Sequence, residues 1–251
     1  PILYDANNIN PLYGFFVARA GLGASESMRS KLAEYNDPRL SRAFITKQGT
    51  SGKEQAPGTA DNAVYAPNGT PEQGTSKYGT SLFMYSISAP TLLLSYHELK
   101  FLEAEALCRL ERDAKSALKD AVVAGLLNAE NSFTISRKEL GKTLINAASS
   151  ITEAEAESYF DNTIEAKYTA EPLKTTMTQK YFALWGASGE ATESYNDVRR
   201  MKGLGENFIE LKNPNSFPLR CPYGNSDTTT NAEVKAAYGN GQYVYSENVW
   251  W

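Results

Sequence analysis

The stretch at residues 95–110, SYHELKFLEAEALCRL, constrains the fold of this chain more than any other feature. Its content of Ala, Leu and Glu favours an α-helix. Its apolar residues, however, follow two neighbouring lines of helical spacing: the first consists of Tyr96, Leu99, Leu102, Ala106 and Leu110, and the second of Phe101, Ala104 and Leu107. A helix that is apolar on two sides is expected to lie between two neighbours.

The following stretch, residues 112–129, predicts the partner of this helix. It places small and apolar residues on one side, where another helix can approach closely: Ala114, Leu118, Ala121, Val122 and Gly125. With a short turn near residues 111–113, the segment 91–129 forms an antiparallel helical hairpin. Hairpins of the tetratricopeptide type bury their faces only against the next hairpin, and at least about three are normally needed. Since one good hairpin is evident, either the later helices complete the layer or partner helices precede residue 1.

Local signals mark the ends of further helices. Ser25 is typical of an N-cap, and Ser136 and Thr152 each precede a Glu by three positions, as in a capping box. Pro172 suits the first turn of a helix, and the stretch at 190–205 predicts a short helix that ends on glycine. No stretch alternates for long enough to predict a sheet, so the predicted class is mainly α.

Two regions outside the helices lack a regular pattern. Residues 45–80 are crowded with Gly, Pro, Ser, Thr and Asn, and a loop of this length is usually functional or disordered. Prolines within residues 213–231 disfavour helix, so the tail is expected to run extended. We expect a single region over residues 1–251, with a loop-rich part at 1–90, a helical part at 91–210 and an extended tail at 211–251.

The bulk composition narrows the classes of function. With 251 residues, 41% of them hydrophobic, the chain can bury a sizeable core. A net charge of −4 gives no basic surface, which argues against nucleic-acid binding. No run approaches the roughly 20 apolar residues that a membrane span needs. The two cysteines, Cys108 and Cys221, indicate neither a metal site nor a disulfide framework.

The sequence offers little for catalysis. Glycosidases need two carboxylates at a set separation, but among 29 acidic residues such pairs arise on solvated helix faces and at helix caps. His97 is the only histidine, and no G-x-S-x-G motif accompanies it. The glycine-rich stretches at 21–26 and 203–206 lack the third glycine of a dinucleotide fingerprint. We therefore expect no catalytic residue, no cofactor and no metal site.

A binding function suits the loop at 45–80 better. Sugars present patches of C–H that an aromatic ring can cover, and their hydroxyl groups bond to amides and to the polar tip of tyrosine. The loop holds such residues, and the predicted ligand-binding set is Tyr65 and Tyr78, with Asn62 and Asn68 as polar partners. The alternative is that both tyrosines hold the loop in place.

Four segments in order resemble the SusD/RagB family. They are the hairpin SYHELKFLEAEALCRL with SALKDAVVAGL, the upstream NPLYGFF and YNDPRL, the stretch TTMTQKYFALWGASGEATESYNDVRRMKG, and FPLRCPYGNSDTTTN. The last departs from the family's Pro-Arg-Tyr-Pro stretch, because Cys221 and Pro222 precede Tyr223, and Asp227 stands where Glu is usual. Family members are about twice as long, and the matches belong to their C-terminal half. We therefore expect that the family's N-terminal half, with its further helical repeats and lipidated cysteine, is not part of this sequence.

This resemblance implies a SusD-like, mainly α fold with tetratricopeptide-type hairpins and long irregular loops. It also implies a lipid-anchored protein at the outer-membrane surface of Bacteroidetes, which captures glycans or other nutrients without cutting them. The implied partner is a SusC-like TonB-dependent transporter, whose contact surface is expected partly on the exposed face of residues 91–129. The alternative is a helical-repeat scaffold for protein–protein interaction with no small-molecule site.

Overall fold

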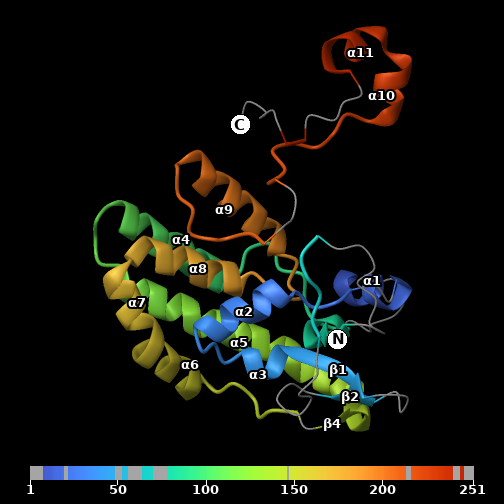
Figure 1. The fold of residues 1–251 in the computed structure, drawn as a ribbon. Coiled ribbons are helices and arrows are strands. Elements are labelled where there is room, and N and C mark those ends of the chain that lie inside the picture. Colours follow the sequence, from blue (N-terminus) through green and yellow to red (C-terminus); the bar gives the residue numbers. More distant parts are fainter. Residues whose placement is uncertain are drawn as a thin grey trace. The chain divides into compact units, whose positions relative to one another are not determined.

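The computed structural model describes residues 8–19, 22–48, 53–55, 64–69, 78–145, 147–212, 216–239 and 244–245. The chain divides into two compact units, Pro1–Glu210 and Leu211–Trp251. Most of the described residues of the first unit are helical (Figure 1). Its helices are α1 (Pro11–Arg19), α2 (Glu26–Glu34), α3 (Leu40–Ala43), α4 (Tyr96–Arg109), α5 (Lys115–Leu140), α6 (Glu153–Tyr159), α7 (Glu165–Ala170), α8 (Pro172–Ala183) and α9 (Ala191–Gly203), with a π-helical segment, η4 (Phe160–Ile164), between α6 and α7.

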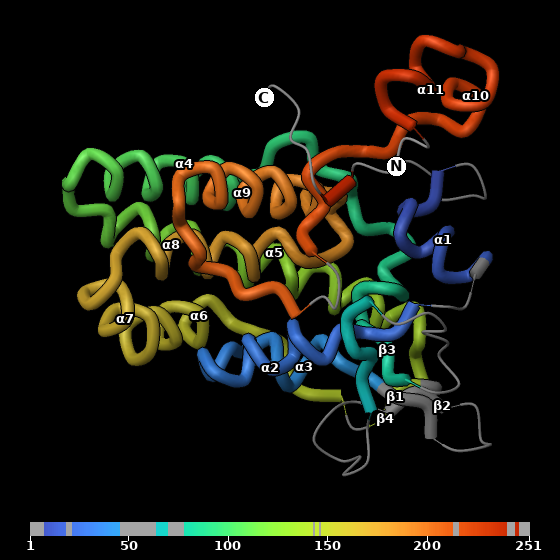
Figure 2. Tube along the Cα trace, turned by 45° about the horizontal axis from the view of Figure 1, so that its top comes forward, coloured from blue at the N-terminus to red at the C-terminus, as the bar shows by residue number. Residues whose placement is uncertain are grey.

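The predicted hairpin is confirmed as α4 and α5. Ser95 caps α4 by accepting a hydrogen bond from the backbone N–H of Glu98 at 3.0 Å. The turn into α5 places Glu111 in the left-handed region, with φ of 55°, and the N–H of Arg112 donates to the Leu107 carbonyl at 2.9 Å. Helix α8 then packs against both members of the pair, and Figures 1 and 2 show the three lying side by side.

The close approach of α5 and α8 depends on a small residue. A Cβ atom at Gly125 would lie 2.9 Å from the Cβ of Ala183, so glycine is needed there, as the small side chains on this face of the predicted hairpin suggested. Large side chains fill the rest of the core between the helices. Those with no exposed surface include Phe101, Leu118, Phe133, Phe160 and Phe182.

Three of the four predicted helix starts are confirmed, and the fourth is wrong. Ser25 and Thr152 cap α2 and α6 through their side chains, and Pro172 opens α8. Ser136, however, lies inside α5, which runs on to residue 140. Because Ser136 is fully buried, its hydroxyl donates to the Ser132 carbonyl one turn earlier, at 3.0 Å, in place of capping a new helix.

The prediction that residues 45–80 form only a loop is also wrong in part, because a small sheet stands at one end of the helical layer (Figure 1). Strands β1 and β2 pair antiparallel, with Thr46 opposite Gln55, while β3 pairs antiparallel with β1 and β4 parallel with β2. Such short strands leave no alternation long enough to recognise in a sequence. The strands, in the order β3-β1-β2-β4 across the sheet, are Thr80–Ser81, Phe44–Gln48, Lys53–Gln55 and Leu144–Ile145.

The second unit differs from the extended tail that the prolines predicted. It contains α10 (Asn225–Thr230) and α11 (Ala232–Tyr238). The prolines precede α10 and therefore do not block it, and Asn231 caps α11 by accepting hydrogen bonds from the next residues. Tyr223 and Tyr238 stack with ring centroids 4.5 Å apart. None of the described helices in either unit is both long and apolar enough to cross a membrane.

Candidate ligand-binding region and the exposed side of α4

Three segments far apart in the sequence are tied together by backbone hydrogen bonds beside the sheet. The N–H of Ala24 donates to the Gly79 carbonyl, that of Ala66 to the Ala24 carbonyl, and that of Gly79 to the Val64 carbonyl, each at 2.8 Å. Ser25 and Ala66 also form a parallel bridge. We call these three hydrogen bonds and the bridge the tie. The tie holds the described parts of the predicted loop against the start of α2 and β3.

Tyr65 is buried within this tie and exposes 5% of its surface. Its ring meets Phe44 edge to face at a centroid distance of 5.3 Å, and the guanidinium group of Arg29 lies 5.2 Å from its centroid. Gly79 permits this packing, because a Cβ atom there would lie 2.7 Å from the ring. Burial raises the pKa of the Tyr65 hydroxyl, against an opposing effect of Arg29. Protein groups therefore surround this ring.

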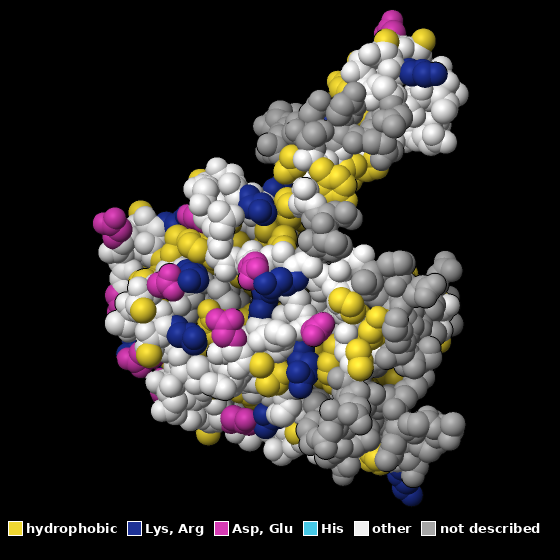
Figure 3. Space-filling model, viewed as in Figure 1, with side chains coloured by type: hydrophobic (Ala, Val, Ile, Leu, Met, Phe, Trp, Pro, Cys, Tyr) yellow, Lys and Arg dark blue, Asp and Glu magenta, His cyan; other side chains and the backbone are white. Residues whose placement is uncertain are grey.

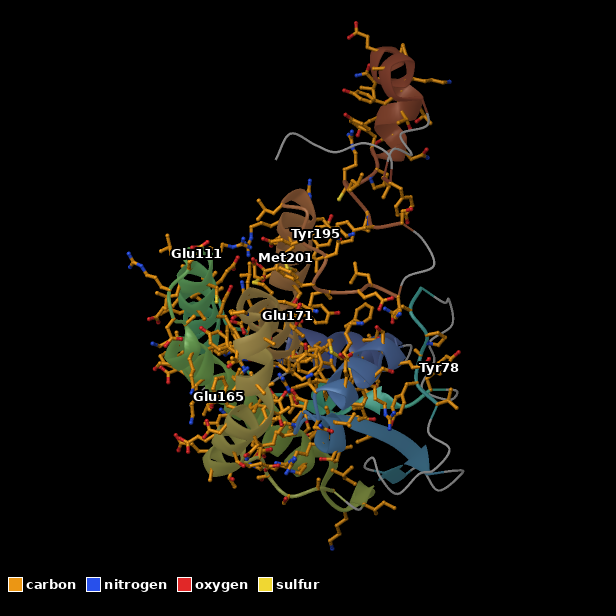
Figure 4. The ribbon with its side chains drawn as sticks, turned by 60° about the vertical axis from the view of Figure 1, so that its left-hand side comes forward. Tyr78, Glu111, Glu165, Glu171, Tyr195 and Met201 are labelled. Carbon is orange, nitrogen blue, oxygen red and sulfur yellow. The ribbon has the colours of Figure 1, made fainter. Side chains whose placement is uncertain are left out.

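The structure brings a second tyrosine and one asparagine of the predicted set into the same neighbourhood. Tyr78 directly precedes the tie, on the sheet side of the first unit (Figure 4), and exposes 8% of its surface. The side-chain oxygen of Asn68 accepts a hydrogen bond from the Ser25 hydroxyl at 2.8 Å. Asn62 lies outside the described residues. Tyr65, Tyr78 and Asn68 thus belong to one structural region, the tyrosines as buried members.

A second feature is the outer side of α4. The two apolar lines that the sequence predicted for this helix have different surroundings. Phe101 and Ala104 of one line are fully buried, mainly by the contacts that α4 makes with α5 and α8. Large side chains of the other line each expose between 42% and 62% of their surface. We call this exposed line, with one residue that precedes the helix, the α4 ridge: Leu94, Tyr96, Leu99, Leu102 and Leu110.

A groove of about 640 Å³ lies beside the N-terminal end of the α4 ridge, where two of the five ridge residues line it. Its apolar lining comes partly from α5, through Val123, Ala124 and Leu127, and partly from the ridge itself. Its rim carries Glu153 and Glu157 of α6. Among the described residues, neither of these carboxylates has an ion-pair partner, and the rest of the lining mixes apolar residues with polar side chains of α4 and α5.

On the other side of the ridge, a groove of about 480 Å³ between α4 and α9 is lined by charged residues. Glu105 accepts hydrogen bonds from Arg109 at 2.7 Å and from Arg200 at 2.8 Å. Burial acts to raise the pKa of Glu105, but these hydrogen bonds outweigh it and lower the pKa. Asp197 pairs with Arg200 at 2.8 Å and with Lys180 at 2.7 Å. This network joins α9 to α4 and α8.

The single histidine takes part in a buried contact at the first turn of α4. His97 Nε2 lies 3.3 Å from Glu190 Oε2, although the two atoms are not aligned as a hydrogen bond. The N–H of Ser95 donates to the other oxygen of Glu190 at 3.2 Å. Burial acts to raise the pKa of Glu190, but the interactions with His97, Ser95 and Ser188 lower it to about 2. This contact holds the turn before α9 against α4.

Two properties of the described residues bear on the kind of site that they can form. No three His, Cys, Asp or Glu side chains in this part of the chain are grouped so that they could hold a metal ion. Basic and acidic side chains are interspersed over the face of the first unit seen in Figure 3, which is unlike the single-sign field of a nucleic-acid interface. The features that can take part in recognition are the tied loop region, the α4 ridge and its grooves.

A family model of SusD-like proteins, described as starch-binding and associating with the outer membrane, matches residues 1–223. The chain belongs to the SusD/RagB family. This confirms the resemblance inferred from the four segments and the mainly α, SusD-like fold. It also places this SusD-like chain among outer-membrane-associated proteins. No curated protein matches the chain.

Solved structures from Bacteroides species resemble this SusD-like chain. A SusD/RagB family protein of Bacteroides thetaiotaomicron VPI-5482 is 64% identical, with a TM-score of 0.90 over 99% of this chain and 54% of its own. A SusD homologue of Bacteroides fragilis NCTC 9343 is 19% identical, with a TM-score of 0.64 over 98% of this chain and 56% of its own. Another from the same strain is 17% identical, with a TM-score of 0.58 over 90% and 50%. The chain thus spans about half the length of these relatives.

Proposed function

We propose that this chain is part of a non-catalytic protein that captures oligosaccharides at the bacterial outer membrane and passes them to a SusC-like TonB-dependent transporter. The observation that carries the proposal is the family match over residues 1–223, because the family is described as starch-binding and associating with the outer membrane. A lipid anchor holds the full-length protein at the cell surface. Capture of this kind requires no nucleophile, no proton transfer and no cofactor.

The proposed ligand site lies in the loop region at residues 45–80. Its proposed contributing residues are Tyr65, Tyr78, Asn62 and Asn68. The tie between the segments at 22–26, 64–68 and 78–81 supports this choice, since it gives a loop surface a fixed base. Because both tyrosines are buried, their main contribution is to hold the shape of this region. The side-chain amide of Asn68 is proposed to bond to sugar hydroxyl groups.

The first experiment is isothermal titration of the full-length protein against a panel of oligosaccharides, followed by chromatography of the recovered sugars. We expect saturable binding of at least one oligosaccharide, which is recovered at its original length. Release of shorter sugars would contradict the non-catalytic part of the proposal.

The second experiment locates the site. Tyr78→Phe and Asn68→Ala each remove one polar group, so we expect each to weaken binding about 5- to 10-fold, the equivalent of about one hydrogen bond. Tyr65→Phe keeps the buried ring and tests its hydroxyl group in the same way. Tyr195→Phe on α9 is the matched control and is expected to leave affinity unchanged. Unaltered binding in all three test variants would place the site elsewhere in the protein.

A second candidate function is a helical-repeat interaction scaffold with no small-molecule site. The observation that favours it is the exposed α4 ridge, an apolar surface of the kind that protein interfaces cover. The glycan panel separates the two candidates, because a scaffold gives no saturable binding to any sugar while keeping its protein partner.

A further inference from the structure

The loop region also holds a cationic group that the sequence did not mark, the guanidinium group of Arg29. Arg29 is an exposed residue of α2, and its guanidinium carbon lies 5.2 Å from the centroid of the Tyr65 ring. Burial raises the pKa of the Tyr65 hydroxyl group, and the charge of Arg29 opposes this rise. Arg29 therefore lies at the surface of the proposed ligand site, next to one of its tyrosines.

The packing around Tyr65 holds this guanidinium group in place. The ring is buried, it contacts Phe44 edge to face, and it leaves no room for a Cβ atom at Gly79, so its position is fixed. A guanidinium group that stacks on such a ring gains a cation–π attraction and gives up part of its side-chain freedom when the protein folds. A ligand of Arg29 thus meets a cation that is already ordered, and less entropy is lost on binding.

The charge of Arg29 is not neutralised by the fold. Other arginines of the first unit bond to carboxylates of that unit: Arg39, Arg42, Arg109, Arg137 and Arg200. Among the described residues, no carboxylate forms an ion pair with Arg29, although Glu26 lies one turn earlier on the same helix. The exposed Glu26 opposes an anionic ligand only at a distance, where solvent and salt screen its charge. The guanidinium group of Arg29 therefore keeps its N–H donors for a ligand.

A fixed guanidinium group binds one kind of sugar substituent best. Its parallel N–H groups match the two oxygens of a carboxylate, and such charge-assisted bonds are roughly twice as strong as bonds between neutral groups. Neutral hexoses offer only hydroxyl groups, whereas uronic acids carry a carboxylate on the sugar ring. The region around Arg29 is otherwise polar, because the Ser25 hydroxyl and the Asn68 side chain are hydrogen-bonded to each other there. This combination suits an acidic sugar.

We propose that Arg29 binds the carboxylate of a uronic acid, so that the loop region selects acidic oligosaccharides over neutral ones. This inference rests on the proposed capture of glycans and adds to it the chemical class of the sugar. Tyr65 has a positioning role, since its ring orders the guanidinium group that makes the contact. This division explains how a buried tyrosine contributes to a site at the surface.

Titration with matched sugars tests the selectivity. The probes are hexamers of galacturonate, of glucuronate and of mannuronate, each paired with its methyl ester, which keeps the rings and linkages but carries no charge. We expect the full-length protein to bind at least one uronate hexamer and to bind the ester of that hexamer at least about tenfold more weakly. Added salt should weaken the binding of the uronate and leave that of the ester unchanged, because only the first contact is between charges.

The outcomes separate this inference from the proposed function. Equal affinity for each uronate and its ester, or binding of neutral oligosaccharides alone, would overturn the selectivity and leave the capture of glycans intact. The absence of binding to any sugar, acidic or neutral, would overturn both.

Substitutions assign the contact to Arg29. Arg29→Gln removes the charge, so we expect uronate binding to weaken at least about tenfold and ester binding to change less than about twofold. Arg29→Lys keeps the charge without the fork and should give an intermediate loss. The control is Arg112→Gln, since Arg112 is exposed and without an ion pair among the described residues but follows Glu111, far from Tyr78 in Figure 4. An unchanged preference for the uronate in Arg29→Gln would overturn the role of Arg29.

Discussion

The two sides of α4 carry similar amounts of apolar side chain and have opposite surroundings. Phe101 and Ala104 are sealed between α5 and α8, while Leu99 and Leu102 face solvent in this chain. The buried side also holds polar groups: His97 contacts Glu190 of the turn before α9, and Glu105 pairs with Arg200 of α9. Burial in this helix thus follows from the neighbours that are present, and the number of leucines on a side does not decide it.

The largest loss of stability is expected for a substitution on the buried side of α4. Phe101→Ala removes a ring that exposes no surface, and the resulting cavity is expected to lower the free energy of unfolding by about 3–5 kcal/mol. Urea denaturation of residues 1–251, followed by circular dichroism, measures this value. Leu102→Ala, one residue away on the ridge, is the control and is expected to change it by less than about 0.5 kcal/mol. Equal losses in the two variants would show that both sides are packed.

A smaller loss of stability is expected for a substitution where the buried side of α4 contacts the turn before α9. Glu190→Gln weakens the contact with His97, and we expect the free energy of unfolding at pH 7 to fall by about 1–2 kcal/mol. The folded-state pKa of Glu190 is about 2, below its ordinary value of 4.5. The carboxylate therefore contributes stability above pH 4.5 and loses it as the pH falls toward 2.

Denaturation curves between pH 7 and pH 3 check this dependence. The difference between the wild type and Glu190→Gln should shrink below pH 4.5, and a difference that widens there would contradict the assignment. Carboxyl resonances of Glu98 give a second readout. Burial and then the charge of Glu190 raise the pKa of Glu98, so its pKa should move toward the ordinary value in the variant.

The parts of the fold that the sequence predicted are those with strong local signals. The two-line helix, the caps at Ser25 and Thr152 and the opening proline of α8 all lie where expected, because caps and helical periodicity depend on neighbouring residues. Ser136 failed as a cap because its burial, which sets its hydrogen bond, depends on distant contacts. The short strands and helix α10 were not predicted for a related reason. A strand of two to five residues and a helix of six leave little periodic signal in the sequence, and strand pairing depends on distant partners.

The candidate site was predicted less completely than the fold. Composition drew attention to Tyr65, but its burial follows from the approach of Gly79 and Phe44, which no local pattern shows. The contact between His97 and Glu190 joins residues 93 positions apart, and nothing near either residue marks it. The two-line pattern of α4 predicted neighbours on both apolar sides, whereas in this chain one line is packed by α5 and α8 and the other is exposed as the α4 ridge.

The smallest loss of stability is expected for a substitution on the α4 ridge. In residues 1–251 alone, Leu99→Ser should change the free energy of unfolding by less than about 0.5 kcal/mol, because a half-exposed leucine without a partner loses little packing. Urea denaturation of residues 1–251 measures this value. A loss of more than about 1 kcal/mol would show that Leu99 is packed against other residues, and the two sides of the helix would then have similar surroundings.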